Sequence, residues 1–252
     1  MTAQRTALVL SAGGLFGAWQ AGAWKHLAQV IEPDMIIGAS VGALNGWCTA
    51  SQWSPCEMSE IWLDPQLAGT APQDRPGIFR GYYDPEPLRR TVGVLWSGRR
   101  PTIPFYLVTV ELPLCRSRII SSENLTSDHL VATCSIPILF PPVRISGRIH
   151  VDGGVFGQLP LWAAAELGAT RIIALDCLPK ISPWWVQATM SSLHLLSPTR
   201  KLPKEIHTLR PSGYMGTAHH AIEYDPDRIR RWLQMGEKDA QTALPESLIR
   251  LQ

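Results

Sequence analysis

The chain has 252 residues, of which 45% are hydrophobic and 17% are charged, and its 23 basic and 21 acidic side chains give a net charge of +2. The charged share is below the usual share of about 25%, and such a composition excludes disorder for most of the chain. Because the charge is nearly balanced and no basic block stands out, we expect no nucleic-acid partner. At roughly 100–200 residues per domain, the length predicts a single domain over residues 1–252.

The five cysteines are widely spaced and form no C-x-x-C pair. This pattern indicates neither a disulfide framework nor a zinc site, and free thiols are typical of a reducing compartment. No group of histidines, cysteines and carboxylates has the spacing of metal ligands. We therefore expect a cytoplasmic protein with no metal and no cofactor.

Residues 7–24 are uncharged and largely apolar, as in a signal peptide, but four glycines and Gln20 interrupt them. No other stretch is long and apolar enough to predict a membrane span. We therefore expect residues 7–24 to belong to the folded domain.

The first fifty residues have a regular order of elements. Residues 6–11 form a short apolar run, which predicts a buried parallel strand, and the spacing of apolar residues predicts a helix over 17–31. Residues 34–38 predict a second buried strand, and residues 40–49 predict a second helix. Strand, turn and helix, repeated, predict an α/β domain with a parallel sheet.

The pattern beyond residue 50 is more varied. Residues 51–81 contain several prolines and show little periodicity, so we expect an irregular segment with some helix around 55–62. A loop-rich stretch is expected over 178–215. Further helices are predicted over 87–96, 127–135 and 159–167 and from Asp225 onward, and further strands over 103–112, 118–121, 148–152 and 171–177.

Gly38, Ser40 and Gly42 form a G-x-S-x-G motif between a predicted strand and a predicted helix. This is the setting of a nucleophile elbow, in which a strained serine is presented at a strand-to-helix turn. The amino end of the following helix would direct free N–H groups at the anion formed on attack. We therefore predict that Ser40 is a nucleophile; a turn of small residues is the alternative.

A second glycine-rich segment, with Gly13, Gly14 and Gly17, follows the first predicted strand. Successive N–H groups in such a turn can bind an anion, here the oxyanion of a tetrahedral intermediate. The alternative is a dinucleotide-binding fingerprint. However, Ala12 stands at its first glycine, and Asp34 opens the second strand instead of lying near its end. We therefore predict an oxyanion site.

Asp152 ends a predicted strand and is followed by Gly153 and Gly154. A strand end is the usual place for a catalytic acid in an α/β sheet, and flanking glycines allow another residue to approach closely. Taken by itself, this residue is more simply a turn aspartate, but together with the first two motifs we predict that it acts with Ser40. His150 lies on the same strand face, and we interpret it as a neighbour of the site.

The order of a glycine-rich turn, G-x-S-x-G and Asp-Gly-Gly resembles the patatin-like phospholipase family. Residues 135–142 and 159–160 are also similar to the family pattern, and the resemblance covers about residues 6–177. It implies a three-layer α/β fold whose central, mostly parallel sheet is flanked by helices. It further implies a serine acyl hydrolase acting on lipid or other acyl esters. In this resemblance Ser40 is the nucleophile, Asp152 is the general base, and the N–H groups of Gly13, Gly14 and Leu15 form the oxyanion hole.

Three positions depart from the family pattern. Ala12 stands for a glycine, Phe16 for a basic residue and Gln158 for an asparagine. These changes bear on headgroup preference and oxyanion geometry but leave the predicted nucleophile and base in place. A non-catalytic lipid- or ligand-binding module that keeps the fold is the alternative function.

A Ser–His–Asp triad would require a histidine late in the chain. His207, His219 and His220 are late enough, but they lie in loop-like sequence, and Asp176 is the second candidate acid. Residues 183–196 include two tryptophans and are a candidate for peripheral membrane contact, with local packing as the alternative. A cover over the acyl pocket formed by residues 63–81 is compatible with the sequence, although no pattern indicates it.

Overall fold

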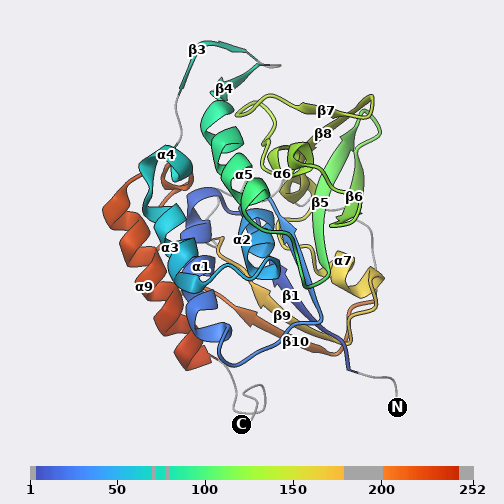
Figure 1. Cartoon of the computed structure of the whole chain (residues 1–252), viewed down its shortest axis with the longest axis vertical. Coiled ribbons are helices and arrows are strands. Elements are labelled where there is room, and N and C mark those ends of the chain that lie inside the picture. Colours follow the sequence, from blue (N-terminus) through green and yellow to red (C-terminus); the bar gives the residue numbers. More distant parts are fainter. Residues whose placement is uncertain (1–3, 70–71, 78–79, 179–200, 244–252) are drawn as a thin grey trace.

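Figure 1 shows the computed structural model, which describes residues 4–69, 72–77, 80–178 and 201–243. Its centre is an eight-stranded sheet, in which β6 (Arg116–Ser121) pairs with one of the seven strands of the main path. That path is β10 (Glu205–Leu209), β9 (Arg171–Leu175), β1 (Thr6–Leu10), β2 (Met35–Ala39), β5 (Phe105–Leu112), β8 (Arg148–Asp152) and β7 (Val143–Ile145). The first five strands of the path are parallel, and β6, β7 and β8 pair in antiparallel fashion. The predicted mostly parallel sheet is confirmed.

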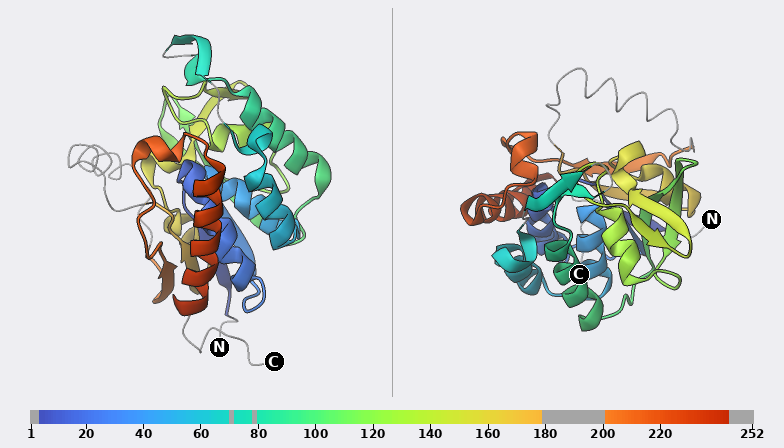
Figure 2. Two further views of the ribbon diagram at one scale, coloured as in Figure 1. Left: turned by 90° about the vertical axis from the view of Figure 1, so that its left-hand side faces the viewer. Right: turned by 90° about the horizontal axis from the view of Figure 1, so that it is seen from above.

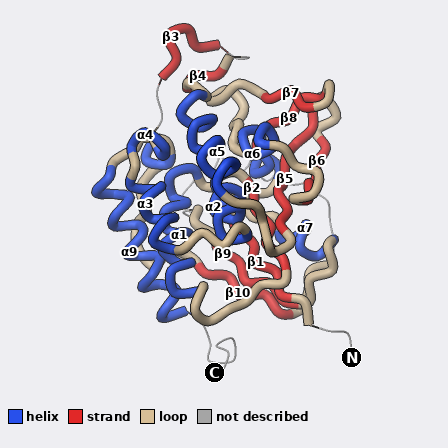
Figure 3. Tube along the Cα trace, viewed as in Figure 1, coloured by secondary structure: helices blue, strands red, loops and turns tan. Residues whose placement is uncertain are grey.

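Helices cover both faces of the sheet, which gives the three layers seen in Figures 2 and 3. Because successive strand residues point to opposite faces, each strand contributes to two cores. In β1, Leu8 and Leu10 face the larger helical layer, whereas Ala7 and Val9 face the smaller one. The larger layer holds α1 (Gly17–Leu27), α2 (Val41–Ala50), α3 (Pro55–Leu63), α5 (Glu86–Gly98), α6 (Ser127–Thr133) and α9 (Pro226–Ala243), and the smaller one holds α7 (Leu161–Glu166).

Helix α9 packs beside α1 at very short range (Figure 1). A Cβ atom at Gly236 would lie 2.0 Å from the carbonyl oxygen of Trp19, and one at Gly22 would lie 2.0 Å from that of Leu233. The indole Nε1 of Trp19 donates a hydrogen bond of 2.7 Å to the carboxylate of Asp239. Two missing side chains therefore let the first and last helices approach backbone to backbone.

The central strand β5 has three partners on two edges. It pairs with β6 over residues 106–111, with β2 over 105–108 and with β8 over 109–112. Since a strand has only two edges, β2 and β8 lie end to end along the edge opposite β6. Ala39 at the end of β2 pairs with Val108, and Asp152 at the end of β8 pairs with Thr109. The carboxyl ends of β2 and β8 therefore meet at one point of the sheet.

Most predicted elements are confirmed within a few residues, and the strand predicted over 148–152 has the predicted bounds. The helix predicted over 17–31 ends earlier, at Leu27, and is preceded by the short turn η1 (Gly14–Phe16). The irregular segment 51–81 contains helix α3 as predicted, but also α4 (Pro65–Ala68) and a strand, β3 (Pro72–Gly77), that pairs with β4 (Gly81–Tyr83).

The prediction of loop over 178–215 is wrong at residues 205–209, which form β10. This strand is at the edge of the sheet and most of its side chains are only half-buried, so it lacks the apolar run of a central strand. Strand β7 was also missed, because three residues are too few to show a period. The candidate interfacial segment 183–196 lies outside the described residues. Within the described part of the chain, no helix is long and apolar enough to cross a membrane.

The contact between α1 and α9 predicts opposite effects for two glycine-to-alanine changes. Replacing a glycine within a helix by alanine ordinarily stabilises a protein by up to about 1 kcal/mol. Gly93→Ala in α5 should follow this rule, because a Cβ there meets nothing within 4 Å. Gly236→Ala should instead lower the free energy of unfolding by roughly 1–3 kcal/mol, because its methyl group would force α9 away from α1. Urea denaturation of both variants measures the difference, and a stabilised Gly236→Ala variant would contradict the close approach.

Candidate active site

Ser40 lies in the tight turn between β2 and α2, with φ of 54° and ψ of −133°. A residue other than glycine with positive φ stores conformational strain, which is typical of functional turns. The glycines on either side make the turn possible. A Cβ at Gly38 would lie 2.3 Å from the carbonyl oxygen of Gly42, and one at Gly42 would lie 2.5 Å from that of Leu10. The structure therefore gives the G-x-S-x-G motif the strained geometry expected of an elbow.

The turn is held by Thr133, a residue that the sequence did not single out. Its hydroxyl accepts a hydrogen bond of 3.0 Å from the backbone N–H of Ser40 and donates one of 2.7 Å to the carbonyl oxygen of Val108. Thr133 is fully buried at the end of α6. Its side chain thus connects the serine turn to β5 at the point where β2 stops, a role that only the fold reveals.

Asp152 is held at the same point from the other side. Its backbone N–H donates to the carbonyl oxygen of Ser135 at 3.0 Å, just beyond α6. Its Oδ1 accepts a hydrogen bond of 2.6 Å from the N–H of Gly154. The other carboxylate oxygen, Oδ2, is buried and has no partner at hydrogen-bond geometry in the part of the chain that the structure describes. One carboxylate oxygen is therefore fixed and the other is available.

Burial raises the pKa of Asp152 to about 7, and the nearby Ser40 hydroxyl and the N–H of Gly154 oppose that rise. The Ser40 hydroxyl is therefore close to the carboxyl group. Cys134 lies beside both: burial and the charge of Asp152 raise the pKa of its thiol, and the Ser40 hydroxyl opposes this. The structure brings the predicted nucleophile and the predicted base together.

The glycine-rich turn lies next to Ser40. Gly14 and Leu15 line the same pocket as Ser40, and Gly14 has a φ of +55°, a conformation that favours glycine. In the described part of the chain, the N–H groups of Gly13, Gly14 and Leu15 donate to no backbone or side-chain acceptor. Gly13 itself lies against Cys177 and does not line the pocket.

Val41, the first residue of α2, is a second position that sequence reasoning missed. It lines the pocket beside Ser40, and its N–H is one of the first donors of α2, which have no partner within the helix. The residue that follows the nucleophile often contributes to an oxyanion hole. The elbow motif could have indicated Val41, because it places the residue after the serine at the amino end of a helix. The other motif glycines, Gly17, Gly153 and Gly154, each leave no room for a Cβ atom.

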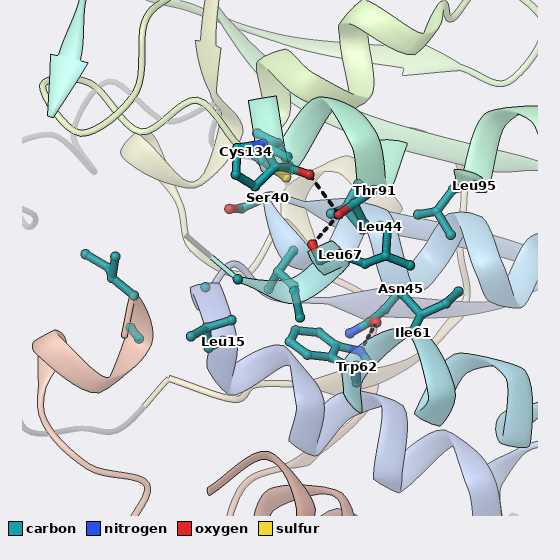
Figure 4. A pocket seen from close by; sticks show the side chains of 18 of the residues that line it. Leu15, Ser40, Leu44, Asn45, Ile61, Trp62, Leu67, Thr91, Leu95 and Cys134 are labelled. Carbon is teal, nitrogen blue, oxygen red and sulfur yellow. Dashed lines mark hydrogen bonds between the residues drawn. The ribbon is translucent and has the colours of Figure 1, made fainter. Parts of the chain in front are cut away.

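The pocket that contains Ser40 has a volume of about 140 Å³ and is lined mainly by apolar side chains. In Figure 4, Ser40 and Cys134 lie together at one end, and Trp62 and Asn45 lie toward the other. The indole N–H of Trp62 donates to Asn45, so these polar atoms are satisfied within the wall. The further apolar lining comes from α2, α3, α4 and α5, through Leu44, Met58, Ile61, Leu67, Leu88 and Leu95.

The wall includes part of the segment suggested as a cover. Leu67, Ala68 and Gly69 line the pocket, and the carbonyl oxygen of Leu67 accepts a hydrogen bond from Thr91 on α5. The described part of residues 63–81 therefore contributes to the pocket wall up to Gly69.

None of the described histidines lines this pocket. His150 shares a strand face with Asp152, but its Nδ1 is 3.1 Å from the hydroxyl of Thr109, and burial lowers its pKa. His207 lies in β10 beside Glu205, and the other late histidines lie on η3 (Ala218–Ala221). Asp176 is paired with Arg210 at 2.9 Å and does not line the pocket either.

The positions that depart from the family pattern have structural roles. The N–H of Ala12 donates to the carbonyl oxygen of Gln158 at 2.8 Å, which ties the glycine-rich turn to the segment after Asp152. Phe16 is buried, and its ring packs edge-on against Trp232 of α9 at 5.1 Å. An apolar side chain at position 16 thus serves the contact with the last helix. Among the described residues, no three His, Cys, Asp or Glu side chains are grouped as metal ligands.

A mostly parallel, three-layer α/β fold with a strained serine between strand and helix defines a protein of the nucleophile-elbow class. The family model of the patatin-like phospholipases matches residues 8–165, which is more than half of the chain. The chain therefore belongs to the patatin-like phospholipase family.

Similar proteins agree with this assignment. The neuropathy target esterase sws of Drosophila melanogaster is 29% identical over 191 residues, which cover 70% of this chain and 13% of that protein. The patatin-like phospholipase domain-containing protein 7 of Rattus norvegicus is 26% identical over 207 residues, covering 74% of this chain and 15% of the relative. The chain thus corresponds to a small part of these relatives. The crystal structure of VipD from Legionella pneumophila shares the fold, with a TM-score of 0.53, 10% identity, and coverage of 95% of this chain and 66% of that one.

The Thr133 contact predicts a difference between two substitutions. Thr133→Val keeps the shape of the side chain but leaves the Ser40 N–H and the Val108 carbonyl oxygen without their buried partner, which costs about 1–3 kcal/mol of stability. It should also slow the reaction of Ser40 with a fluorophosphonate, because the turn is no longer held. Thr133→Ser keeps the hydroxyl and should label at nearly the wild-type rate, although it loses a buried methyl group. Equal labelling rates for the two variants would contradict a positioning role.

Proposed function

We propose that this chain hydrolyses acyl esters of lipids through an acyl-enzyme formed on Ser40, with Asp152 as the general base. The observation that carries the proposal is the convergence of the two residues where β2 and β8 meet on β5, at one end of an apolar pocket. A serine hydroxyl on a strained backbone turn and a buried carboxylate, one oxygen of which has no hydrogen-bond partner among the described residues, are the groups that acyl transfer requires.

The reaction has two steps. Ser40 Oγ attacks the ester carbonyl carbon while Oδ2 of Asp152 takes the hydroxyl proton, and the carbonyl π electrons move to the oxygen. The tetrahedral intermediate then collapses, its bond to the alcohol oxygen breaks, and Asp152 returns the proton to the leaving alcohol. In the second step water attacks the acyl-enzyme, Asp152 takes a proton from the water, and Ser40 leaves with that proton to release the fatty acid.

The base is suited to this task by its surroundings. A carboxylate with an ordinary pKa is a weak base for an alcohol, whereas a pKa of about 7 lies near physiological pH, where proton transfer is most effective. Burial raises the pKa of Asp152 to that value, and no like charge contributes to the shift. The environment therefore strengthens the base directly, without a histidine as intermediary.

The oxyanion would be stabilised by backbone N–H groups beside Ser40. The free N–H groups of Gly14 and Leu15 lie on one side of the pocket, and that of Val41 lies at the amino end of α2. We include Gly13, whose N–H likewise donates to no acceptor among the described residues. Such donors act in a site with little water, where one donor is typically worth about 2.7–4 kcal/mol in the transition state.

The acyl chain would occupy the apolar part of the pocket. Leu44, Ile61 and Leu95 offer no hydrogen bonds to a ligand, and the polar atoms of Asn45 and Trp62 already bond to protein groups. A fatty acyl chain is the part of a lipid that gains most from such a site.

The proposed dyad predicts which variants lose activity. Ser40→Ala and Asp152→Asn should each lower kcat on a nitrophenyl ester by about a thousandfold or more, because each removes a group that takes part in bond making or proton transfer. Single alanine variants of all seven histidines should keep most of their activity. Circular dichroism confirms that each variant is folded. One folded histidine variant as inactive as Ser40→Ala would instead support a triad, and an active Ser40→Ala would overturn the proposed function.

The raised pKa of Asp152 also predicts how activity and stability depend on pH. The base must be ionised, so kcat/KM should rise with pH through an apparent pKa of about 7. Stability changes in the opposite direction, because a folded-state pKa above the unfolded value of about 4 favours the folded protein below pH 4, and this contribution is lost as the pH rises to about 7. Asp152→Asn removes the buried charge, so its stability relative to the wild type should increase between pH 4 and pH 8. Denaturation curves across this range provide the measurement, and a constant difference would contradict the raised pKa.

A further inference from the structure

Two large apolar side chains are exposed next to each other at one end of the molecule. Tyr82 and Ile138 are each 54% exposed. They belong to segments that run side by side: the N–H of Tyr82 donates to the carbonyl oxygen of Ile138 at 3.1 Å, and the N–H of Tyr83 donates to that of Leu139 at 2.9 Å. Figure 1 shows β4, which carries Tyr82, projecting with β3 beyond the first turn of α5.

The backbone of Ile138 is strained. Its φ is 74°, in the left-handed region that β-branched residues avoid. Asparagine or glycine would adopt this conformation at lower cost. Strain of this kind is usually offset by packing of the side chain or by function. Because the side chain of Ile138 is more than half exposed, burial within the protein does not account for an isoleucine at this position.

The exposed pair continues directly into the wall of the Ser40 pocket. Phe140, two residues after Ile138, and Asp84, two residues after Tyr82, both line that pocket. The two segments also contact each other through the rings of Tyr83 and Phe140, whose centroids are 5.8 Å apart. Apolar side chains therefore connect the outside of the protein to the pocket of the proposed nucleophile along the segment from Ile138 to Phe140, whereas the segment after Tyr82 reaches the pocket at the acidic Asp84.

A basic side chain flanks the pair. Arg80 is exposed and lies two residues before Tyr82, and within the described ranges its guanidinium forms no ion pair. Tyrosine and aliphatic side chains beside a free cation are typical of a surface that enters the headgroup region of a bilayer, where the cation meets lipid phosphates.

We propose that Tyr82, Ile138 and Arg80 form a rim that docks onto the surface of a phospholipid bilayer and places the Ser40 pocket against the lipid. The proposal rests on the proposed lipid acyl hydrolase function and identifies the physical state of its substrate, a lipid within a bilayer. A docked rim would let an acyl chain pass from the bilayer over Tyr83 and Phe140 into the pocket without crossing water.

A double variant, Tyr82→Ser with Ile138→Asn, tests the rim. Asparagine tolerates a φ of 74°, so the second change removes the apolar side chain while respecting the backbone. The matched control is Leu202→Asn. It changes an exposed leucine that precedes β10, at the amino-terminal ends of the parallel strands. All proteins also carry Ser40→Ala in the binding assay, so that no lipid is consumed during the measurement.

The measurements are co-sedimentation with vesicles of phosphatidylcholine and phosphatidylserine in equal parts, and hydrolysis of either the same vesicles or a soluble short-chain nitrophenyl ester. The double variant should bind vesicles about tenfold or more weakly and hydrolyse vesicle lipid correspondingly slowly, while kcat/KM on the soluble ester stays within about twofold of the wild type. Leu202→Asn should behave like the wild type in each assay.

Wild-type vesicle binding by the double variant would overturn the proposal. The proposal would also be overturned if the wild type is a dimer in sedimentation velocity and the double variant is a monomer whose vesicle binding is unchanged. The rim would then be an interface between copies of the chain. Failure of the proposed function is separately visible in the soluble-ester assay, as an inactive wild-type protein or an active Ser40→Ala variant, whatever the outcome of the binding assay.

Discussion

The end-to-end meeting of β2 and β8 on one edge of β5 is the constraint on which the candidate site depends. Two strands of opposite direction share that edge, and their carboxyl ends meet between Val108 and Thr109. The two strands therefore place Ser40, just beyond β2, and Asp152, at the end of β8, next to each other. In a sheet with one continuous strand along this edge, the two groups could not come together in this way.

The junction leaves backbone groups that a continuous strand would have satisfied, and α6 provides their partners. The Thr133 hydroxyl takes the N–H of Ser40 and donates to Val108, and the carbonyl oxygen of Ser135 takes the N–H of Asp152. The last residue of α6 and the segment directly after it thus fix both halves of the proposed dyad. The same helix helps to bury Asp152, and this burial raises the pKa of its carboxyl group. The ionised carboxylate therefore lowers the stability of the folded protein, but it is also well suited to accept a proton.

The helices around the junction also support the candidate site. Helices α2, α3 and α5 enclose an apolar pocket with Ser40 at one end, and α9 supports the glycine-rich turn through the contact of Trp232 with Phe16. The contact of Phe16 with Trp232 joins residues more than two hundred positions apart, so the phenylalanine at position 16 serves the packing of the last helix. Phe140 lines the pocket and lies two residues after Ile138, so the proposed rim, acyl site and dyad are adjacent to one another.

The sequence by itself determined what depends on local physics. Apolar runs and turn residues predicted nearly all of the central strands and helices, and the motif glycines around Ser40 and Asp152 predicted where the backbone must turn tightly. Only the tertiary structure decided what depends on residues distant in sequence. The antiparallel direction of β8, the polar edge strand β10, the roles of Thr133 and Val41, and the raised pKa of Asp152 each arise from neighbours that no local pattern specifies. Hydrogen-bond partners across a sheet and the burial of a charge are properties of the assembled fold, since they are set by which segments meet and not by the residues that flank each position in the chain.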